Sequence, residues 1–116
     1  MKKYNSDKIW LESILEHTEA LESFCAGLSF EDFQNDLKTR LACEKCIQNI
    51  SESSNHLSKE FKEEYKDFPW SQIKGMRNIL VHEYFKIDNR IVWDVIQNFI
   101  PNLKLQVQNV LNSFLL

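Results

Sequence analysis

Glycine and proline are scarce in this chain, and their scarcity limits the possible folds. Only two residues of each type occur among 116. A β-sandwich or barrel of this length needs many tight turns, which rely on these two residues, so the composition argues strongly against an all-β fold. No apolar run approaches the roughly 18 residues of a membrane-spanning helix. The first ten residues, MKKYNSDKIW, contain no hydrophobic region of a secretory signal. We therefore expect no membrane association.

Cysteine and basic charge are limited as well. Cys25, Cys43 and Cys46 cannot all pair within one chain, so we expect reduced thiols and a cytoplasmic location. The formal net charge is −3, with most of the acidic excess before residue 58. Such a chain has no broad basic face for binding duplex DNA through many phosphate contacts. Any RNA or nucleotide should therefore bind in a local cleft, one that two chains share.

Apolar residues, by contrast, are plentiful and recur at helical spacing. Hydrophobic residues make up 43% of the chain and include eight phenylalanines, enough for the core of one domain over residues 1–116. Spacings of three, four and seven predict long helices at 7–24 and about 36–57, and a short surface helix within 58–68. Pro69 should open a third helix, and Pro101 should kink or restart a final one. The sequence predicts an all-α, antiparallel up-and-down bundle of four to five helices.

The segment 69–85, PWSQIKGMRNILVHEYF, carries the most chemistry. In a regular α-helix Arg77 and His82 would lie about 140° apart around the axis, Asn78 would stack below His82, and Tyr84 would share a face with Arg77. One polar strip would then present a permanent cation, an imidazole and a phenol. This set suits metal-free RNA cleavage, in which His82 moves a proton and Arg77 stabilises the charge on the phosphorane.

Each of these residues also has a plainer interpretation. An arginine on a helix is usually a surface ion-pair partner, and a histidine in a last turn often interacts only with the helix dipole. Tyr84 by itself would most often be a half-buried packing residue.

The same segment resembles the HEPN superfamily, and within it the HepT-type toxins of the DUF86 group. Their hallmark is an arginine, four residues, a histidine, any residue and a tyrosine, which Arg77, His82 and Tyr84 match position for position. Asn78 is the polar residue that commonly follows the arginine. The resemblance covers essentially the whole chain. It extends to Pro69-Trp70, Gly75-Met76, Ile91-Val92-Trp93 and Ile100-Pro101, whereas Ser51-Glu52-Ser53 keeps only the glutamate of a usual Gly-Glu-Ala.

The resemblance implies a HEPN-like fold and a metal-independent endoribonuclease, the toxin of a type VII-like toxin–antitoxin pair. Arg77 and His82 would be catalytic and Asn78 supporting, with RNA as substrate and no cofactor or metal. It also implies an antitoxin of the MNT nucleotidyltransferase type, which adds AMP to the Tyr84 hydroxyl. Proteins of this kind form a homodimer or a higher homo-oligomer with their motifs facing a common cleft.

Two other functions remain open. The chain could be a non-catalytic docking and nucleotide-contact subunit of a nucleotidyltransferase, or a helical interaction protein whose motif match is accidental. A nucleotidyltransferase in the neighbouring reading frame would favour the toxin or the docking subunit over the third function.

The remaining polar residues suggest weaker hypotheses. Cys43-x-x-Cys46 could join Cys25 and His56 in a zinc site only by coincidence of the fold, and ordinary thiols are the simpler interpretation. Glu52 and His56 form one helical pair, which makes no metal site alone. His17, between Glu16 and Glu19, is most simply solvated. The apolar tail Phe114-Leu115-Leu116 suggests a buried interface.

Overall fold

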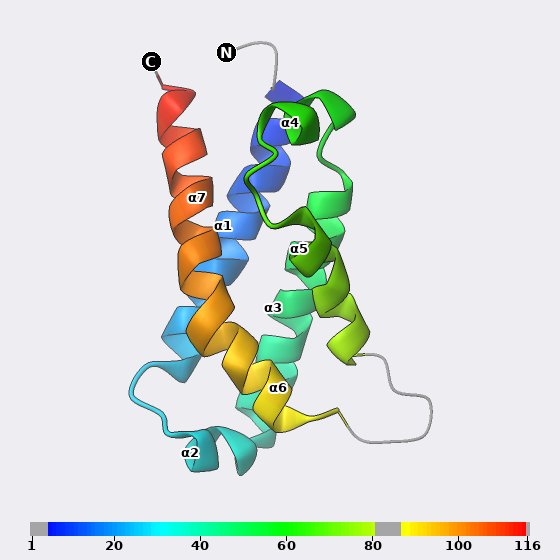
Figure 1. Cartoon of the computed structure of the whole chain (residues 1–116). Coiled ribbons are helices and arrows are strands. Elements are labelled where there is room, and N and C mark those ends of the chain that lie inside the picture. The colour runs from blue at the N-terminus through cyan, green and yellow to red at the C-terminus, as the bar shows by residue number, and fades with distance from the viewer. Residues whose placement is uncertain (1–4, 81–86, 116) are drawn as a thin grey trace.

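The computed structural model describes residues 5–80 and 87–115, and these are entirely helical or loop, with no strand among them (Figure 1). In chain order the α-helices are α1 (Asn5–Cys25), α2 (Phe30–Gln34), α3 (Leu37–Asn55), α4 (Lys59–Glu64), α5 (Trp70–Met76), α6 (Asn89–Asp94) and α7 (Ile100–Ser113). A 3₁₀ turn, η1 (Arg77–Leu80), continues α5, and a π turn, η2 (Val95–Phe99), joins α6 to α7. The all-α prediction is confirmed. Among the described helices, none has the length and apolar character needed to cross a membrane.

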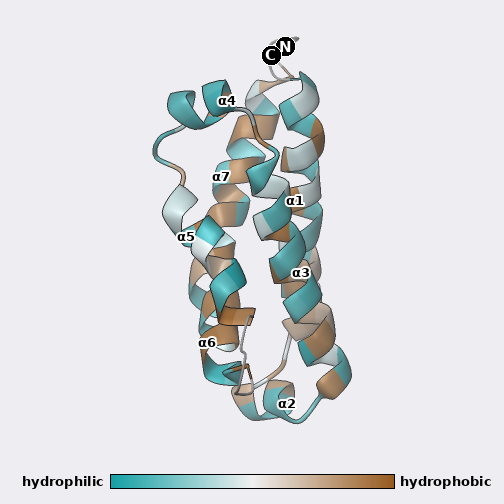
Figure 2. Cartoon of the chain, turned by 90° about the vertical axis from the view of Figure 1, so that its right-hand side faces the viewer, coloured by the Kyte–Doolittle hydropathy of each residue, from teal (hydrophilic) through white to brown (hydrophobic). Residues whose placement is uncertain are grey.

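The helices form an up-and-down bundle about 45 Å long (Figure 1). The chain descends through α1, returns through α3, descends again through α5 and η1, and rises through α6 and α7. Figure 2 shows α2 crossing the lower end of the bundle and α4 lying at the upper end. The core lies between these layers, and its largest fully buried side chains are Phe33, Phe61, Leu11, Ile14, Leu21, Ile47, Ile50, Ile73, Ile100, Leu103 and Val92.

Local capping explains where the first helices begin and end. Gly27, just after α1, has a φ of 76°, the left-handed conformation expected of a glycine beyond a helix end. Ser29 and Asp32 form a reciprocal capping box at the start of α2. Asp36 caps α3, and its hydrogen bonds from the Thr39 hydroxyl and backbone N–H lower the pKa of its carboxyl. The predicted helices at 7–24 and 36–57 are thus confirmed to within two residues.

Small polar residues let α1 and α3 approach closely. Ser51, Ser53 and Ser54 are all buried, at 1%, 4% and 3% exposure. The Ser53 hydroxyl lies 2.9 Å from the Ser13 hydroxyl of α1 in a hydrogen bond. This contact joins the middle of α1 to the C-terminal half of α3.

Pro101 shapes the last helix. Proline has no N–H to donate and its ring crowds the carbonyl four residues earlier, so a regular α-helix cannot pass through it unchanged. The chain responds with the π turn η2, in which the Ile100 N–H bonds to the Val95 carbonyl five residues back. A new α-helix then begins at Ile100, with Pro101 in its first turn. The predicted restart at Pro101 is confirmed, and the two parts form one continuous helical rod.

A buried carboxylate fastens α1 to the turn between α3 and α4. Asp7 is only 2% exposed. Its Oδ1 accepts from the Ser58 backbone N–H at 2.6 Å, and its Oδ2 accepts from the Ser58 hydroxyl at 2.7 Å. The same hydroxyl oxygen accepts from the Phe61 N–H at 3.1 Å, which caps α4. One acid therefore joins α1 to the first turn of α4 at the upper end of the bundle.

We predict that Asp7→Ala lowers the free energy of unfolding by about 2–3 kcal/mol, because two short hydrogen bonds to a buried carboxylate are lost. Urea denaturation followed by circular dichroism measures the change. Glu12→Ala, at an exposed position of the same helix, is the matched control and should change stability by less than about 0.5 kcal/mol. If the two variants unfold at the same urea concentration, the Asp7–Ser58 contact contributes nothing to stability.

Candidate functional site

An aromatic cluster fixes the start of α5, the helix that leads to Arg77. The Trp70 indole N–H donates to the Tyr65 carbonyl at 2.9 Å. Its ring stacks on Phe68, with centroids 5.0 Å apart, and meets Phe61 edge-on at 6.1 Å. The Lys62 ammonium lies 5.7 Å from the Trp70 ring centroid. Pro69 precedes the first helical residue rather than occupying it, and the cluster sets the direction in which the helix leaves.

Arg77 begins a tighter turn than the sequence predicts. The α-helix ends at Met76, and Arg77–Leu80 form the 3₁₀ turn η1, with three residues per turn in place of 3.6. The expectation of a regular α-helix is therefore wrong for Arg77–Leu80. The angular relations of Arg77 and Asn78 to His82 and Tyr84 involve residues outside the described part of the chain and stay predictions. Arg77 and Asn78 are both exposed, whereas Met76 is buried and anchors the turn. His82 and Tyr84 lie outside the described residues.

Arg77 has no acidic residue near it along the chain. Between Asp67 and Glu83 the only charged residues are Lys74 and Arg77. Both are exposed, and among the described residues no ion pair neutralises either of them. Arg77 is thus an exposed cation with no ion-pair partner among residues 5–80 and 87–115, and its guanidinium suits donation to a phosphate oxygen. Asn78 beside it presents a neutral amide.

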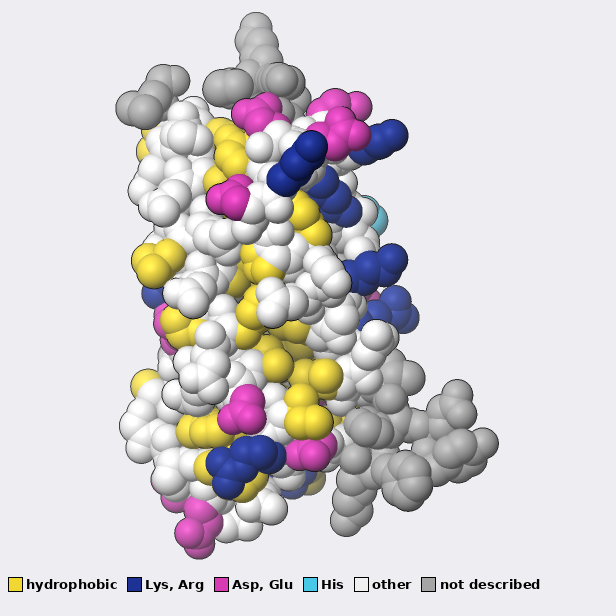
Figure 3. Space-filling model, viewed as in Figure 1, with side chains coloured by type: hydrophobic (Ala, Val, Ile, Leu, Met, Phe, Trp, Pro, Cys, Tyr) yellow, Lys and Arg dark blue, Asp and Glu magenta, His cyan; other side chains and the backbone are white. Residues whose placement is uncertain are grey.

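An open groove runs beside this turn, between α5 and the α6–α7 rod. It consists of two hollows of about 650 and 550 Å³, which share Gln72, Asn98 and Phe99 in their walls. The lower hollow includes Met76 and Ile79, the residues on either side of Arg77 and Asn78. Figure 3 shows this face with apolar and uncharged side chains along its middle and charged ones toward its edges.

The α7 wall of this groove is a row of carboxamides that sequence reasoning did not single out. Asn98, Asn102, Gln106 and Asn109 all line the upper hollow, with Gln72 of α5 opposite them. In the sequence these amides recur at spacings of three and four residues, as on one side of a helix. The segment 95–116 that contains them has one charged residue, Lys104. Because amides are common on solvated helices, this spacing alone pointed to no function.

The cysteines form a buried cluster rather than a metal site. Cys25 and Cys43 lie with their sulfurs 3.6 Å apart, and all three thiols are free and buried. The hydrogen bond to Cys25, with burial, raises the pKa of Cys43 far above its usual range, and burial raises that of Cys46. A zinc site needs thiolates, and these two thiols stay protonated at neutral pH. No group of three metal-binding side chains occurs within residues 5–80 and 87–115.

The other histidines have structural partners. His17 Nδ1 donates to the Ser13 carbonyl at 2.7 Å, and the Asn49 amide lies 3.1 Å from its Nε2. It therefore joins α1 to α3, and the expectation of a merely solvated residue is wrong. His56 stacks on Trp10 at 4.1 Å, while Glu52 accepts from Gln48, so the Glu52/His56 pair does not form.

Comparison with known proteins places this geometry in a family. The family model described as "Ribonuclease HepT-like" matches residues 14–110, which include the whole of α5, η1 and the carboxamide row. "Putative RNase TTE0752" of Caldanaerobacter subterraneus is 41% identical over 104 residues, 90% of this chain and 93% of that protein. "Probable ribonuclease HepT" of Thermococcus cleftensis is 37% identical over 99 residues, 85% and 90% of the two chains. No solved structure gives a significant match.

Proposed function

Because the chain belongs to the HepT-like ribonuclease family, we propose that it is a metal-independent endoribonuclease that acts as the toxin of a toxin–antitoxin pair. One observation carries the proposal: Arg77, the first residue of the family motif, is an exposed cation that no acidic residue within the described part of the chain neutralises. Relatives whose names describe RNases match this chain over nearly their whole length, which supports RNA as the substrate.

In the proposed reaction the 2′-hydroxyl of RNA attacks the adjacent phosphorus and the 5′-oxygen leaves. His82 moves the proton that this exchange requires, because an imidazole gains and loses protons near neutral pH. Arg77 donates to the nonbridging oxygens, on which negative charge grows in the phosphorane. Asn78, next to Arg77, supports the site by hydrogen bonding.

The proposal includes two partners. A nucleotidyltransferase antitoxin of the MNT type would add AMP to the Tyr84 hydroxyl, placing negative charge and bulk two residues from His82 and so excluding RNA. A second copy of the chain would double the positive charge at the cleft, which explains how a chain of net charge −3 binds RNA. Both partners act in the cytoplasm, where the RNA is.

We predict that Arg77→Ala and His82→Ala each reduce RNA cleavage at least about 100-fold, the size of effect typical of losing a general acid–base group or a charge-stabilising donor. Cleavage of a labelled RNA and growth inhibition on induction measure it. Arg90→Ala, an exposed arginine of α6, is the matched control and should keep full activity. A folded His82→Ala protein with normal toxicity would contradict the proposal, and a wild-type protein that binds the antitoxin without cleaving RNA would favour a docking subunit.

We also predict that cleavage continues at an unchanged rate in excess EDTA. His82 and Arg77 supply the proton transfer and charge stabilisation that a divalent ion supplies in other nucleases. The assay compares initial rates with and without chelator at constant ionic strength. Activity lost on chelation and restored by added Mg²⁺ or Mn²⁺ would show that the proposed chemistry lacks a component.

Tyr84 gives the sharpest prediction for the partner. Incubation with the antitoxin, ATP and Mg²⁺ should add about 329 Da per AMP to the Tyr84 oxygen and stop cleavage. A phenol is a weak nucleophile at neutral pH, so the antitoxin must supply the base and the metal-bound ATP. Tyr84→Phe should remain an active nuclease that cannot be modified, and peptide mass spectrometry locates the adduct. Modification at Tyr4 or Tyr65, or silencing of Tyr84→Phe by antitoxin and ATP, would assign the acceptor elsewhere.

A further inference from the structure

Two of the buried cysteines are in contact at the lower end of the bundle, and one of them lines a hollow in the surface. We propose that Cys25 is a site of oxidation by small hydroperoxides, and that Cys43 then attacks it to form a reversible disulfide between α1 and α3. This inference goes beyond the proposed function and does not depend on it, because neither cysteine belongs to the motif segment.

The two sulfurs are placed for a disulfide. Cys25 is the last residue of α1 and Cys43 lies in the second turn of α3, and their Sγ atoms are 3.6 Å apart. A disulfide bond is about 2 Å long, so the sulfurs need to approach by less than about 2 Å. Cys25 can supply this movement, because a residue at a helix end is held by fewer hydrogen bonds than one in the middle.

The hollow gives a peroxide access to Cys25. Its volume is about 240 Å³, and Cys25 lines it together with Gly27, which follows α1, and Pro101 of α7. No atom lies within 4 Å of the position that a side-chain carbon on Gly27 would take, so this wall is open. A small hydroperoxide needs the space of one or two water molecules, at about 30 Å³ each, and therefore fits. Cys43 does not line the hollow, so Cys25 meets the peroxide first.

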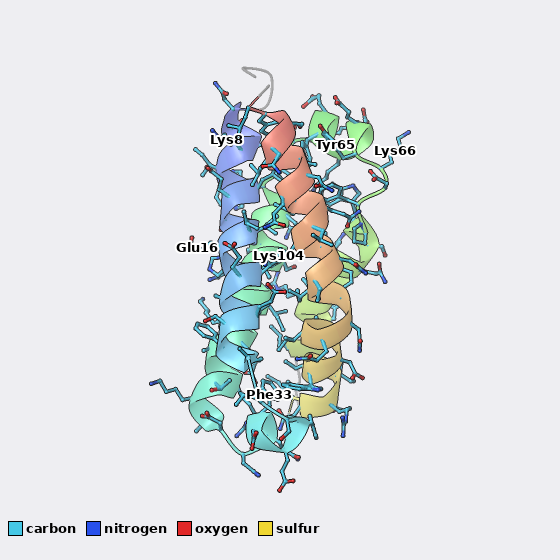
Figure 4. The ribbon with its side chains drawn as sticks, turned by 90° about the vertical axis from the view of Figure 1, so that its left-hand side faces the viewer. Lys8, Glu16, Phe33, Tyr65, Lys66 and Lys104 are labelled. Atoms are coloured by element: carbon cyan, nitrogen blue, oxygen red, sulfur yellow. The ribbon has the colours of Figure 1, made fainter. Side chains whose placement is uncertain are left out.

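The surroundings of Cys25 favour its thiolate, which is the form that attacks a peroxide. The hydrogen bond from Cys43 lowers the pKa of Cys25 and outweighs burial, which raises it. Among the described residues that line the hollow, Glu22 is the charged one, and Lys104 of α7 balances it in an ion pair at 2.7 Å (Figure 4). The negative end of the α1 dipole opposes a thiolate, so the stabilisation comes from Cys43.

One hydroperoxide oxidises both thiols. The Cys25 thiolate attacks one peroxide oxygen, the O–O bond breaks, and the second oxygen leaves with a proton as water or an alcohol. Cys25 is then a neutral sulfenic acid. The hydrogen bond to its thiolate, the main cause of the raised pKa of Cys43, is thereby lost, so Cys43 gives up its proton more readily. The Cys43 sulfur attacks Cys25, the S–O bond breaks, and the oxygen leaves with a proton as water.

Cys46 is a matched comparison within the same chain. It is about as buried as Cys25, with 6% exposure against 5%, and burial raises the pKa of its thiol. Cys46 does not line the hollow. A difference in reactivity between Cys25 and Cys46 therefore reports on the sulfur contact and the hollow rather than on burial.

The disulfide closes a loop of the chain around α2. Cys25 and Cys43 are 18 positions apart, and α2 lies between them. Figure 4 shows Phe33 of α2 at the lower end of the bundle, where its ring centroid lies 5.2 Å from that of Trp93 in α6. Oxidation therefore fastens the corner against which α6 packs, and thiol reductants release it.

The test treats the reduced, folded chain with hydrogen peroxide and then blocks the remaining thiols with N-ethylmaleimide in denaturant. We expect a loss of about 2 Da before blocking, a pair of peptides joined through Cys25 and Cys43, and an alkylated Cys46. The free thiol of Cys25 should disappear at least about tenfold faster than that of Cys46. Dithiothreitol should restore all three thiols. Peptide mass spectrometry measures each of these on the wild-type chain, so the result does not depend on the folding of a variant.

Three variants separate the roles, with circular dichroism as the check on folding. Cys43→Ala should stop at a sulfenic acid on Cys25, about 16 Da heavier, which dimedone traps. Cys25→Ala should leave Cys43 unmodified over the same time. Cys46→Ala is the matched control and should form the disulfide at the wild-type rate.

Four results would overturn the inference. They are a wild-type Cys25 that reacts no faster than Cys46, a disulfide that includes Cys46 or joins two chains, a folded Cys43→Ala protein without sulfenic acid on Cys25, and an equal yield of the Cys25–Cys43 pair from a chain unfolded in urea. None of these measurements involves RNA, so their outcome is separate from that of the proposed function.

Discussion

The close contact of α1 with α3 is the constraint on which the rest of the structure depends. The Ser13–Ser53 and His17–Asn49 hydrogen bonds join the two helices and fix how one is turned relative to the other. Because α3 also packs against α5 and η1, the position of Arg77 is set from behind by this pair of helices. A bulkier residue at Ser53, which is buried and bonds to Ser13 of α1, would push α1 away from α3 and disturb the helix pair behind the motif segment.

Sequence rules predicted the features that depend on near neighbours. The three- and four-residue spacing of apolar side chains acts within a few positions, and α1 and α3 were predicted from it to within two residues. Features that depend on residues far apart in the sequence were not predicted. His17 bonds to Asn49, 32 positions away, so nothing beside it in the sequence indicated a structural role. The 3₁₀ turn at Arg77 was missed because residue spacing assumes one helical geometry and carries no sign of where it tightens.

The short helical segment formed by α5 and η1 has two different surfaces. The side of α5 and η1 that carries Lys74 and Arg77 is cationic and exposed, and the side that faces α7 is neutral and grooved. Two surfaces of different chemistry therefore lie on the same few turns of the chain. The membership of the chain in the HepT-like family agrees with this division, since the matched region spans both surfaces.

The π turn between α6 and α7 does more than accommodate Pro101 in the helix. It holds one residue more than the α-helical turn it replaces, and each residue of a helix changes direction by about 100°. Ile91 before it, Val95 at its start, and Asn102 and Gln106 after it consequently share the wall of a single groove. Removing one residue from 95–99 would rotate the two halves out of phase and divide that wall, even if every remaining side chain were kept. The length of segment 95–99 therefore determines this surface as much as its composition does.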